Sequence, residues 1–417
     1  MTIFNKLKSL FANNEKVVEN YVFMTAMQII SSAFGILIYP YLIRVLGIEP
    51  YGSFVFAIAI IAYFTEFVSF GFHYPSLKVA SLNKNNKSIL SQTFSAALTG
   101  KLLLFLISTV IFTILIFLVP YLNDNKMLFI LVFAQILSEI FYPMWYFQAI
   151  QKMRIVTYIQ LFFRVASLPF IFFMVTTADD LILYAIIHTS TILLSTAALF
   201  YVVVVVDKIK IRFIGINGLK TYFKDAQPFF WSDAATTLKQ QSVTVIIGSF
   251  FGMNDVALYD LANKIITIPR MLTQSINMAI FPKTIENTQT NVVKKIIRFE
   301  FILGILIFLL IAVSGYWLIL LLGGENMIEA LPYLIILSIT IISWLTVDSY
   351  TNFVFIPQKK YYYITLNKAL SIISFLALAL PLTLIFKNSL FIIISLTLST
   401  VFEMIYCNYL IKKQKLL

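Results

Sequence analysis

Seven basic side chains lie inside segments that are otherwise apolar enough to cross a membrane. They are Arg44, Lys101, Arg164, Lys239, Lys264, Arg270 and Lys368. A cation inside hydrocarbon is expensive, so it is normally kept only where it faces a water-filled cavity or an opposite charge. Arg and Lys are also the side chains that bind phosphate oxygens. The sequence therefore predicts an interior that holds a negatively charged group.

The depth of each cation within its segment separates two groups. Lys101, Arg164, Lys239, Lys264 and Arg270 fall near the middle of a hydrocarbon core of about 30 Å. Long side chains near a helix end can instead reach the interface, and two of the seven are close enough to an end to do so. We expect the five central cations to contact an anionic substrate. The two cations near helix ends are Arg44 and Lys368, and we keep Arg44 as a sixth candidate for contact with the substrate.

Acidic side chains inside the same segments are candidates for ion-coupled steps of transport. We select Glu66, Asp233 and Asp260, and the acids Asp348 and Glu403 have the same potential. A structural explanation stays open for each of them. Asp260 and Lys264 are four residues apart on one helical face and can neutralise one another. Asp233 and Lys239 can form a similar pair between helices, and Glu66 can be protonated and hydrogen-bonded.

Catalytic and metal-binding patterns are not apparent in the sequence. The one cysteine, Cys407, has no second cysteine for a disulfide and no companion for a metal site. No HExxH, GxSxG, CxxC or Walker motif occurs in a convincing context. We therefore expect a protein that is not an enzyme and that needs neither a metal nor a cofactor.

Composition places the chain in a membrane. Hydrophobic residues make up 60% of the 417 residues and charged residues 12%, whereas charged residues form about a quarter of a soluble domain. The mean hydropathy is +0.90. The net charge of +12 resides mostly in short links between apolar runs, as in juxtamembrane anchors, so nucleic-acid binding is a poor explanation. The first 21 residues lack the apolar core and cleavage site of a signal peptide, so we expect the first span to be retained.

About twelve apolar segments are long enough to cross the bilayer as helices. We place them at 18–46, 51–77, 90–119, 127–151, 155–177, 181–206, 228–251, 255–282, 299–322, 327–355, 361–386 and 388–411. Alternate links between them hold 22 of the 31 basic residues, whereas the intervening links hold two. The positive-inside rule then predicts a multi-pass protein with both termini in the cytoplasm.

The chain divides into two halves of six spans. The longest hydrophilic link follows the sixth span, which gives an N-terminal lobe at 1–206, a cytoplasmic link at 207–227 and a C-terminal lobe at 228–417. The pattern LGIEPYG after the first span recurs as FGMNDVALYD after the seventh, with Gly47 and Gly252 separated by 205 residues. Six spans return the chain to the same side, so the sequence predicts a parallel repeat.

Polar residues at helical spacing mark spans 1, 2, 7 and 8, which correspond in pairs under this repeat. The second span carries Glu66, Ser69 and His73, and the seventh carries Asp233, Thr236 and Gln240. Polar faces in a bilayer turn toward one another or toward water. We therefore expect an all-α integral membrane protein with two six-helix lobes around a central polar cavity.

Three stretches of sequence resemble a known family of exporters. They are YPYLIRVLGIEPYGSFVFAIAIIAYFTEFVSFGF at 39–72, YPMWYFQAIQKM at 142–153, and FFWSDAATTLKQQSVTVIIGSFFGMNDVALYDLANKI continuing to AIFP at 229–282. With the span count and the two halves, the chain resembles the O-antigen and capsular polysaccharide repeat-unit flippases of the multidrug, oligosaccharidyl-lipid and polysaccharide exporter superfamily.

The resemblance implies a function and partners. Such proteins move a polyprenyl-diphosphate-linked oligosaccharide across the bacterial cytoplasmic membrane by alternating access, and polysaccharide polymerase machinery is a further implied partner. The basic midplane residues agree with a diphosphate substrate. One alternative is a cation-coupled antiporter of drugs or other small molecules from the same superfamily, although cationic drugs would favour an acidic cavity. Another is an integral membrane glycan polymerase, but the outer links are short.

Overall fold

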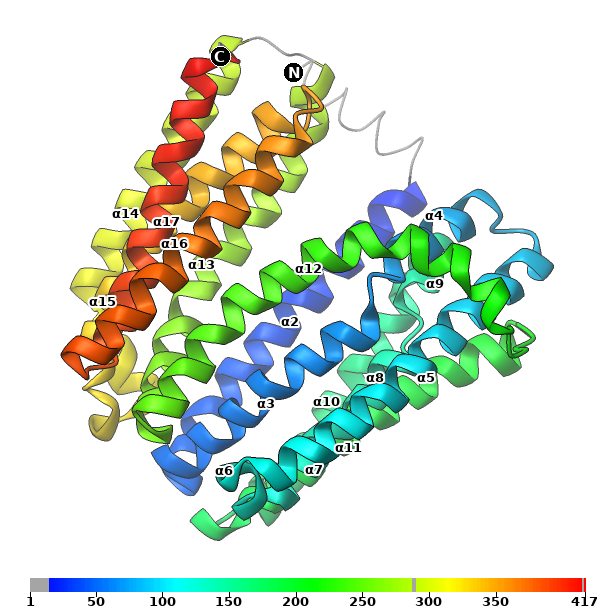
Figure 1. Cartoon of the computed structure of the whole chain (residues 1–417), viewed down its shortest axis with the longest axis horizontal. Coiled ribbons are helices and arrows are strands. Elements are labelled where there is room, and N and C mark those ends of the chain that lie inside the picture. Colours follow the sequence, from blue (N-terminus) through cyan, green and yellow to red (C-terminus); the bar gives the residue numbers. More distant parts are fainter. Residues whose placement is uncertain (1–14, 287–289, 415) are drawn as a thin grey trace. The chain divides into compact units, whose positions relative to one another are not determined.

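The structure, a computed structural model, describes residues 15–286, 290–414 and 416–417 (Figure 1). Its regular structure is helical, and no strand occurs among the described residues, which confirms the predicted all-α class. The α-helices are α2 (Glu15–Leu46), α3 (Ile48–Ser69), α4 (His73–Leu82), α5 (Lys87–Leu118), α6 (Pro120–Asp124), α7 (Lys126–Phe133), α8 (Ile136–Phe141), α9 (Met144–Ala149), α10 (Met153–Met174), α11 (Leu181–Tyr201), α12 (Ile216–Phe250), α13 (Met253–Glu286), α14 (Thr290–Gly323), α15 (Ala330–Tyr350), α16 (Tyr361–Phe386) and α17 (Leu390–Lys413).

Nine helical stretches in the described part of the chain are long and apolar enough to span a bilayer. They coincide with the predicted spans 2–6 and 9–12 and lie at Ile48–Ser69, Lys87–Leu118, Lys126–Ala149, Met153–Met174, Ala178–Val206, Asn291–Gly323, Ala330–Phe355, Tyr362–Phe386 and Leu390–Lys413. The predicted spans 1, 7 and 8 correspond to the long helices α2, α12 and α13. In α12 and α13 charged residues such as Lys239 and Arg270 interrupt the apolar sequence. The chain is a multi-pass membrane protein.

The described chain forms two compact units. The first comprises residues up to Phe34 together with Ile60–Ala234, and the second comprises Gly35–Ala59 together with Ala235–Leu417. Because α2, α3 and α12 each contribute residues to both units, these units do not follow chain order. The lobe boundaries 1–206, 207–227 and 228–417 stay a prediction from the sequence repeat.

In the first unit, a broken span builds the core. Tyr142 precedes Pro143 and adopts an extended conformation, because the proline ring disfavours helical geometry at the preceding residue. The helix therefore stops at α8 and restarts as α9. This break brings Trp145 and Phe147 into a buried cluster with Phe94 of α5. Helix α4 packs on α5 and α9, and α11 packs on α7, α8 and α10.

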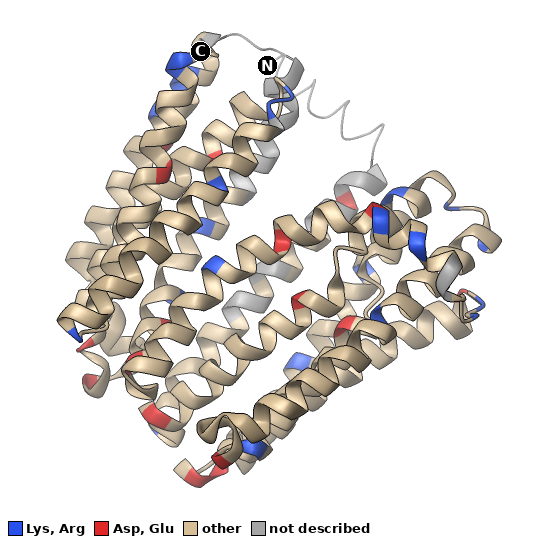
Figure 2. Cartoon of the chain, viewed as in Figure 1, with Lys and Arg blue, Asp and Glu red and all other residues tan. Residues whose placement is uncertain are grey.

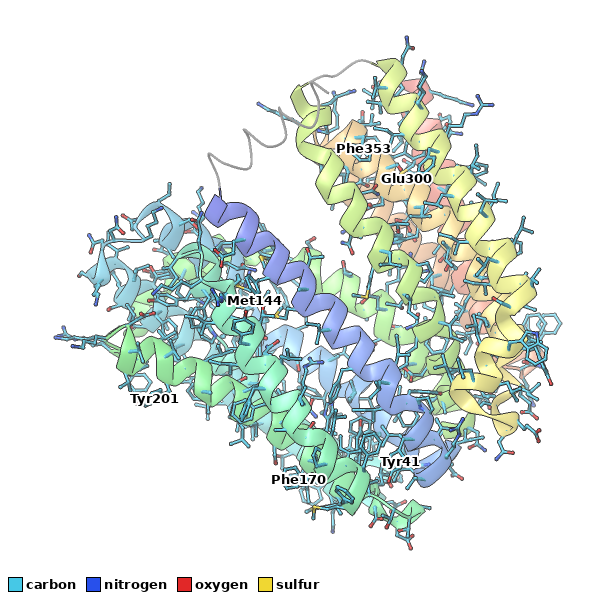
Figure 3. All side chains as sticks on the ribbon, turned by 180° about the vertical axis from the view of Figure 1, so that it is seen from behind. Tyr41, Met144, Phe170, Tyr201, Glu300 and Phe353 are labelled. Carbon is cyan, nitrogen blue, oxygen red and sulfur yellow. The ribbon has the colours of Figure 1, made fainter. Side chains whose placement is uncertain are left out.

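In the second unit, α15 is central. It packs against α13, α14 and α17, while α16 packs against α17. Ile341 and Leu345 on α15 have no exposed surface. Both units carry exposed apolar side chains, Phe170 and Tyr201 in the first and Trp317 in the second. Phe353 of the second unit is buried (Figure 3). Exposed apolar faces of this kind are expected where helices meet lipid.

Two pairs of turns repeat between the halves. Gly47 and Gly252 follow α2 and α12 with φ of +85° and +100°, in the left-handed region that glycine adopts at low cost. The carbonyl of each accepts a hydrogen bond of 3.4 Å from the residue four positions later. Gln151 and Lys359 have φ of +58° and +57°. These turns share their backbone geometry, as a repeat would require, and the repeat of the two lobes stays a prediction.

A segment outside the helices, residues 208–215, precedes α12 and lies along α5; we call it the strap. Its first residue, Lys208, has a positive φ of +58°. Backbone N–H groups of Lys210, Arg212 and Ile214 donate to hydroxyls of Ser91, Ser95 and Thr99, at 3.1, 2.9 and 3.4 Å. Four residues of helix rise about 6.0 Å, and two residues of extended chain about 6.6 Å, so the two repeats nearly match. The hydroxyls of Ser95 and Thr99 donate in turn to carbonyls of α5. Each of these two hydroxyls is therefore oriented to accept a hydrogen bond from a backbone N–H of the strap.

Replacing Ser95 with alanine should loosen the strap. Ser95 is buried, so the change leaves the Arg212 N–H without its acceptor, at a cost of about 1–3 kcal/mol. We expect faster amide exchange in residues 208–215, measured by hydrogen–deuterium exchange of the purified full chain. Ser108→Ala is the matched control, because Ser108 is buried on the same helix and its hydroxyl has no hydrogen-bond partner in the described structure. Equal exchange in the two variants would contradict the role of the ladder.

Candidate functional site

Charged side chains gather mainly near helix ends, and several lie along the helices (Figure 2). In the first unit, Lys101 of α5 meets Glu139 of α8. The Lys101 ammonium lies 2.6 Å from the Glu139 carboxylate and donates a second hydrogen bond of 2.8 Å to the Glu139 carbonyl. The exposed fractions of the two side chains are 5% and 26%. Because its charge is matched by this carboxylate, Lys101 can bind an anion only by exchanging partners.

The other candidates of the first unit lie on separate helices. Arg164 of α10 is partly buried, and its guanidinium lies over the ring of Phe34, 5.7 Å from the centroid. Glu66 of α3 and Asp233 of α12 are partly buried as well. A role for these three in substrate binding or ion coupling stays a prediction.

In the second unit, Lys264 lies in a cage of one carboxylate and two tyrosines. Its ammonium pairs with Asp260 one turn earlier on α13 and donates to the Tyr51 hydroxyl at 2.9 Å. Tyr51 in turn donates to Asp260 at 3.0 Å. The rings of Tyr39 and Tyr51 lie 5.1 and 5.5 Å from the ammonium, within the range of cation–π attraction. The local pair considered from the sequence, Asp260 with Lys264, is confirmed.

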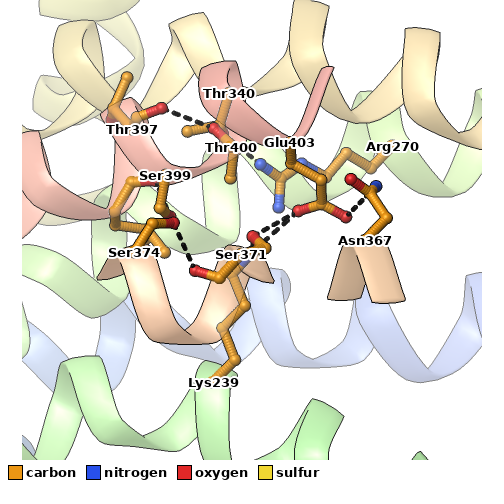
Figure 4. Close-up of polar contacts among 11 residues, drawn as sticks. Lys239, Arg270, Thr340, Asn367, Ser371, Ser374, Thr397, Ser399, Thr400 and Glu403 are labelled. Carbon is orange, nitrogen blue, oxygen red and sulfur yellow. Dashed lines mark hydrogen bonds and ion pairs between the residues drawn. The ribbon is translucent and has the colours of Figure 1, made fainter. Parts of the chain in front are cut away.

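Lys239 on α12 lies in a second polar network of this unit. Its ammonium is 3.0 Å from the Glu403 carboxylate of α17 and donates to the Ser371 hydroxyl of α16 (Figure 4). Ser371 donates to the same carboxylate oxygen at 2.6 Å, and the Asn367 amide reaches the other oxygen at 3.5 Å. The carboxylate that Lys239 meets is therefore that of Glu403 and not that of Asp233, the partner considered from the sequence.

Arg270 on α13 differs from the three lysines, because no carboxylate pairs with it in the described part of the chain. Its terminal nitrogen donates to the Thr340 hydroxyl of α15 (Figure 4). Its guanidinium lies 5.9 Å from the ring centroid of Trp344. The Nε atom is buried and lacks a hydrogen-bond partner among the described residues. A guanidinium offers five N–H donors, so Arg270 keeps donor capacity for an anion.

The two cations near helix ends are exposed. Arg44 donates to the carbonyl of Leu321 at 3.4 Å, which satisfies part of its guanidinium without balancing its charge. Lys368 on α16 is also exposed. Both positions agree with side chains that can reach an interface.

The structure brings the sequence-predicted residues into separate groups. Lys239, Lys264 and Arg270 lie in the second unit, and Lys101 and Arg164 in the first. The polar partners of these cations and of Glu403 were not predicted from the sequence; they are Asn367, Ser371, Thr340 and Tyr51. Asn367, Ser371 and Ser374 follow helical spacing on an otherwise apolar span, and this stripe was a usable signal. In the described part of the chain, no group of three His, Cys, Asp or Glu side chains could hold a metal ion.

The fold resembles solved transporter structures. A lipid II flippase, MurJ, in an inward closed conformation superposes with a TM-score of 0.73 over 94% of this chain and 87% of that one, at 12% identity. An inward-facing multidrug resistance MATE family transporter of the MOP superfamily superposes with a TM-score of 0.61 over 93% and 95%, also at 12% identity. At these identities the likeness shows a shared fold.

Sequence comparisons identify the family. A protein of Escherichia coli (strain K12) named "Putative O-antigen transporter" is 26% identical over 310 residues, which are 74% of each chain. A protein of the same name from Shigella dysenteriae is 22% identical over 252 residues, which are 60% of this chain and 63% of the relative. The family model described as polysaccharide biosynthesis protein matches residues 17–288, more than half of the chain. With the transporter fold, this match confirms the resemblance, and the chain belongs to the polysaccharide biosynthesis protein family.

Proposed function

We propose that this protein is a flippase that moves a polyprenyl-diphosphate-linked oligosaccharide, an O-antigen or capsule repeat unit, across the bacterial cytoplasmic membrane. The relatives named as O-antigen transporters support the substrate class, and the likeness to a lipid II flippase supports the transporter fold. Transport proceeds by alternating access around a central cavity, with both termini in the cytoplasm. Polysaccharide polymerase machinery receives the unit on the outer side.

Arg270 is the observation that carries this proposal. It is a cation within a membrane helix, with a buried Nε that no described acceptor satisfies and no carboxylate partner in the described structure. Leaving such a group unused would be costly in a low-dielectric site. A diphosphate supplies several anionic oxygens, and a guanidinium can bind two of them side by side. Arg270 is therefore the headgroup contact in our proposal.

Each lysine can bind an anionic group of the substrate by exchange of partners. When the cavity holds no substrate, the carboxylates of Glu139, Glu403 and Asp260 balance the three ammonium groups. A phosphate that approaches competes for each ammonium and releases a carboxylate, which can then take up a proton or another cation. This exchange would link substrate binding to the coupling role predicted for Asp260, whereas the coupling roles of Glu66 and Asp233 stay predictions from the sequence. Arg164 and Arg44 are further candidate contacts.

Replacing Arg270 with alanine should slow transport about tenfold to hundredfold, because a hydrogen bond to a charged group contributes about 1.5–3 kcal/mol. The assay uses the full chain in proteoliposomes with a fluorescent polyprenyl-diphosphate-linked oligosaccharide, and measures how fast the sugar becomes accessible to a membrane-impermeant reagent. Arg270→Lys keeps the charge but loses the paired donors, so we expect an intermediate rate.

Lys368→Ala is the matched control, since it removes an exposed cation of the same unit. It should transport at the rate of the unchanged protein. Normal transport by correctly folded Arg270→Ala would remove the proposed headgroup contact. Transport of a cationic dye, with no movement of the lipid-linked sugar, would favour the antiporter instead. Sugar-chain growth without flipping would favour the glycan polymerase.

A further inference from the structure

A pocket of about 530 Å³ lies among α14, α15 and α17 in the second unit. Lys294, Arg298 and Phe301 line it from α14, and Asn408 and Lys412 line it from α17. Helix α15 packs against both of these helices. Its lining residues Thr346 and Tyr350 are buried, so α15 forms the floor. The volume falls within the range of small-ligand sites.

The side chains that line this pocket carry three positive charges and no negative charge. Lys294, Arg298 and Lys412 are exposed, and no Asp or Glu is among the lining side chains. None of the three forms an ion pair in the described part of the chain, in contrast to Lys101 and Lys239. Lys294 and Arg298 are four residues apart on one face of α14, and Lys412 lies in the last turn of α17. Three cations from two helices therefore converge on one concavity.

The pocket is also bordered by apolar side chains that face outward. Phe301 of α14 and Ile405 of α17 are 39% and 58% exposed and lie in membrane-spanning stretches. Ordinary basic residues at the end of a span interact with lipid headgroups individually. Here the cations border one end of the hollow, and the apolar side chains continue from it along the helices. This combination fits a ligand with a compact anionic head and a hydrocarbon tail.

We propose that this pocket binds an anionic phospholipid of the surrounding bilayer. The phosphate of the headgroup lies among Lys294, Arg298 and Lys412, Asn408 donates to one of its oxygens, and an acyl chain runs along Phe301 and Ile405. Basic pockets between transmembrane helices are suited to anionic headgroups. The site is separate from the proposed substrate contact at Arg270, because it involves other faces and other residues. Its occupancy can be tested without any transport assay.

The test is native mass spectrometry of the purified full chain in detergent, titrated with phosphatidylglycerol or with phosphatidylcholine of the same acyl chains. We expect preferential binding of phosphatidylglycerol. Changing Lys294, Arg298 and Lys412 together to Gln should weaken it at least about tenfold, since each cation contributes to attraction for anionic lipid. The control changes Lys295, Lys360 and Lys413 to Gln, which removes the same charge from exposed residues outside the pocket. It should bind normally.

A second variant provides an independent test in case the triple variant does not fold. Asn408→Glu keeps all three cations but places a carboxylate among them, so it should also prevent phosphatidylglycerol binding, whereas Asn408→Gln should not. Equal binding of both lipids, or equal loss in the control triple variant, would overturn the proposal. Displacement of phosphatidylglycerol by millimolar inorganic phosphate would assign a free-phosphate site instead. Preferential capture of a polyprenyl diphosphate would assign the site to the transport substrate.

Discussion

Replacing Gly52 with alanine is expected to destabilise the fold by more than about 3 kcal/mol, beyond the usual range for overpacking. A Cβ atom at Gly52 would lie 1.9 Å from the carbonyl oxygen of Met253 and 2.7 Å from its carbonyl carbon. These are backbone atoms, so no side-chain rotation can relieve the overlap. The starts of α3 and α13 must move apart, which would also disturb the cage of Tyr51 and Lys264. Thermal unfolding in detergent, with the yield of monodisperse protein, measures the loss.

Gly35→Ala is the matched control in the same unit. A Cβ atom there meets no atom within 4 Å, and Gly35 is exposed within α2. Alanine should therefore raise stability by about 0.5–1 kcal/mol, since glycine is a poor helix former. If both variants unfolded at the temperature of the unchanged protein, the close approach of α3 and α13 would be wrong.

Replacing Glu139 with alanine should cost about 3–5 kcal/mol, as expected when one partner of a buried pair is removed. The Lys101 side chain is 5% exposed and would be left with only the carbonyl acceptor. Lys101→Met should cost less, because the Glu139 side chain that remains is 26% exposed and can be hydrated. The two melting temperatures, measured on purified protein in detergent, test this asymmetry.

Two further variants complete this test. Replacing Lys101 with Met and Glu139 with Leu together should recover most of the lost stability, since no unpaired charge is then left in the core. Lys152→Ala removes a pair with Asp207 in which the lysine side chain is 51% exposed and the charged atoms lie 3.6 Å apart. It should cost less than about 1 kcal/mol. Equal effects of Glu139→Ala and Lys152→Ala would contradict a buried ion pair.

The helices could be predicted because their signals are local. Length and apolar character define a span without knowledge of its neighbours, and all twelve predicted segments contain helix. The repeat was visible because Gly47 and Gly252 mark equivalent turns, and both take positive φ values. The pair of Asp260 and Lys264 was accessible for the same reason, since both residues lie on one face of one helix.

The partners of the other cations were not predictable in this way. Lys239 and Glu403 are separated by 164 positions, and several acids were equally eligible in the sequence. Which one lies opposite depends on how α12, α16 and α17 pack. The side chains of α5 that accept hydrogen bonds from the strap could not be predicted, for another reason. Ser91, Ser95 and Thr99 have ordinary helical spacing, and the groups that they bind are backbone amides, which no side-chain pattern reveals.

The hydrogen bonds between the strap and α5 pair two repeats of slightly different length. The helical repeat of α5 and the extended repeat of the strap differ by about 0.6 Å per hydrogen bond. The mismatch between donors and acceptors therefore grows along the segment, and only a few such hydrogen bonds can form. The next hydroxyl position along α5 is occupied by Leu103, and the strap gives way to α12 at Ile216. Alternate amides of an extended chain point in opposite directions, so inserting one residue would turn the donors away, whereas inserting two would restore their parity. The link between the two halves of the chain should therefore tolerate the insertion of two residues better than the insertion of one.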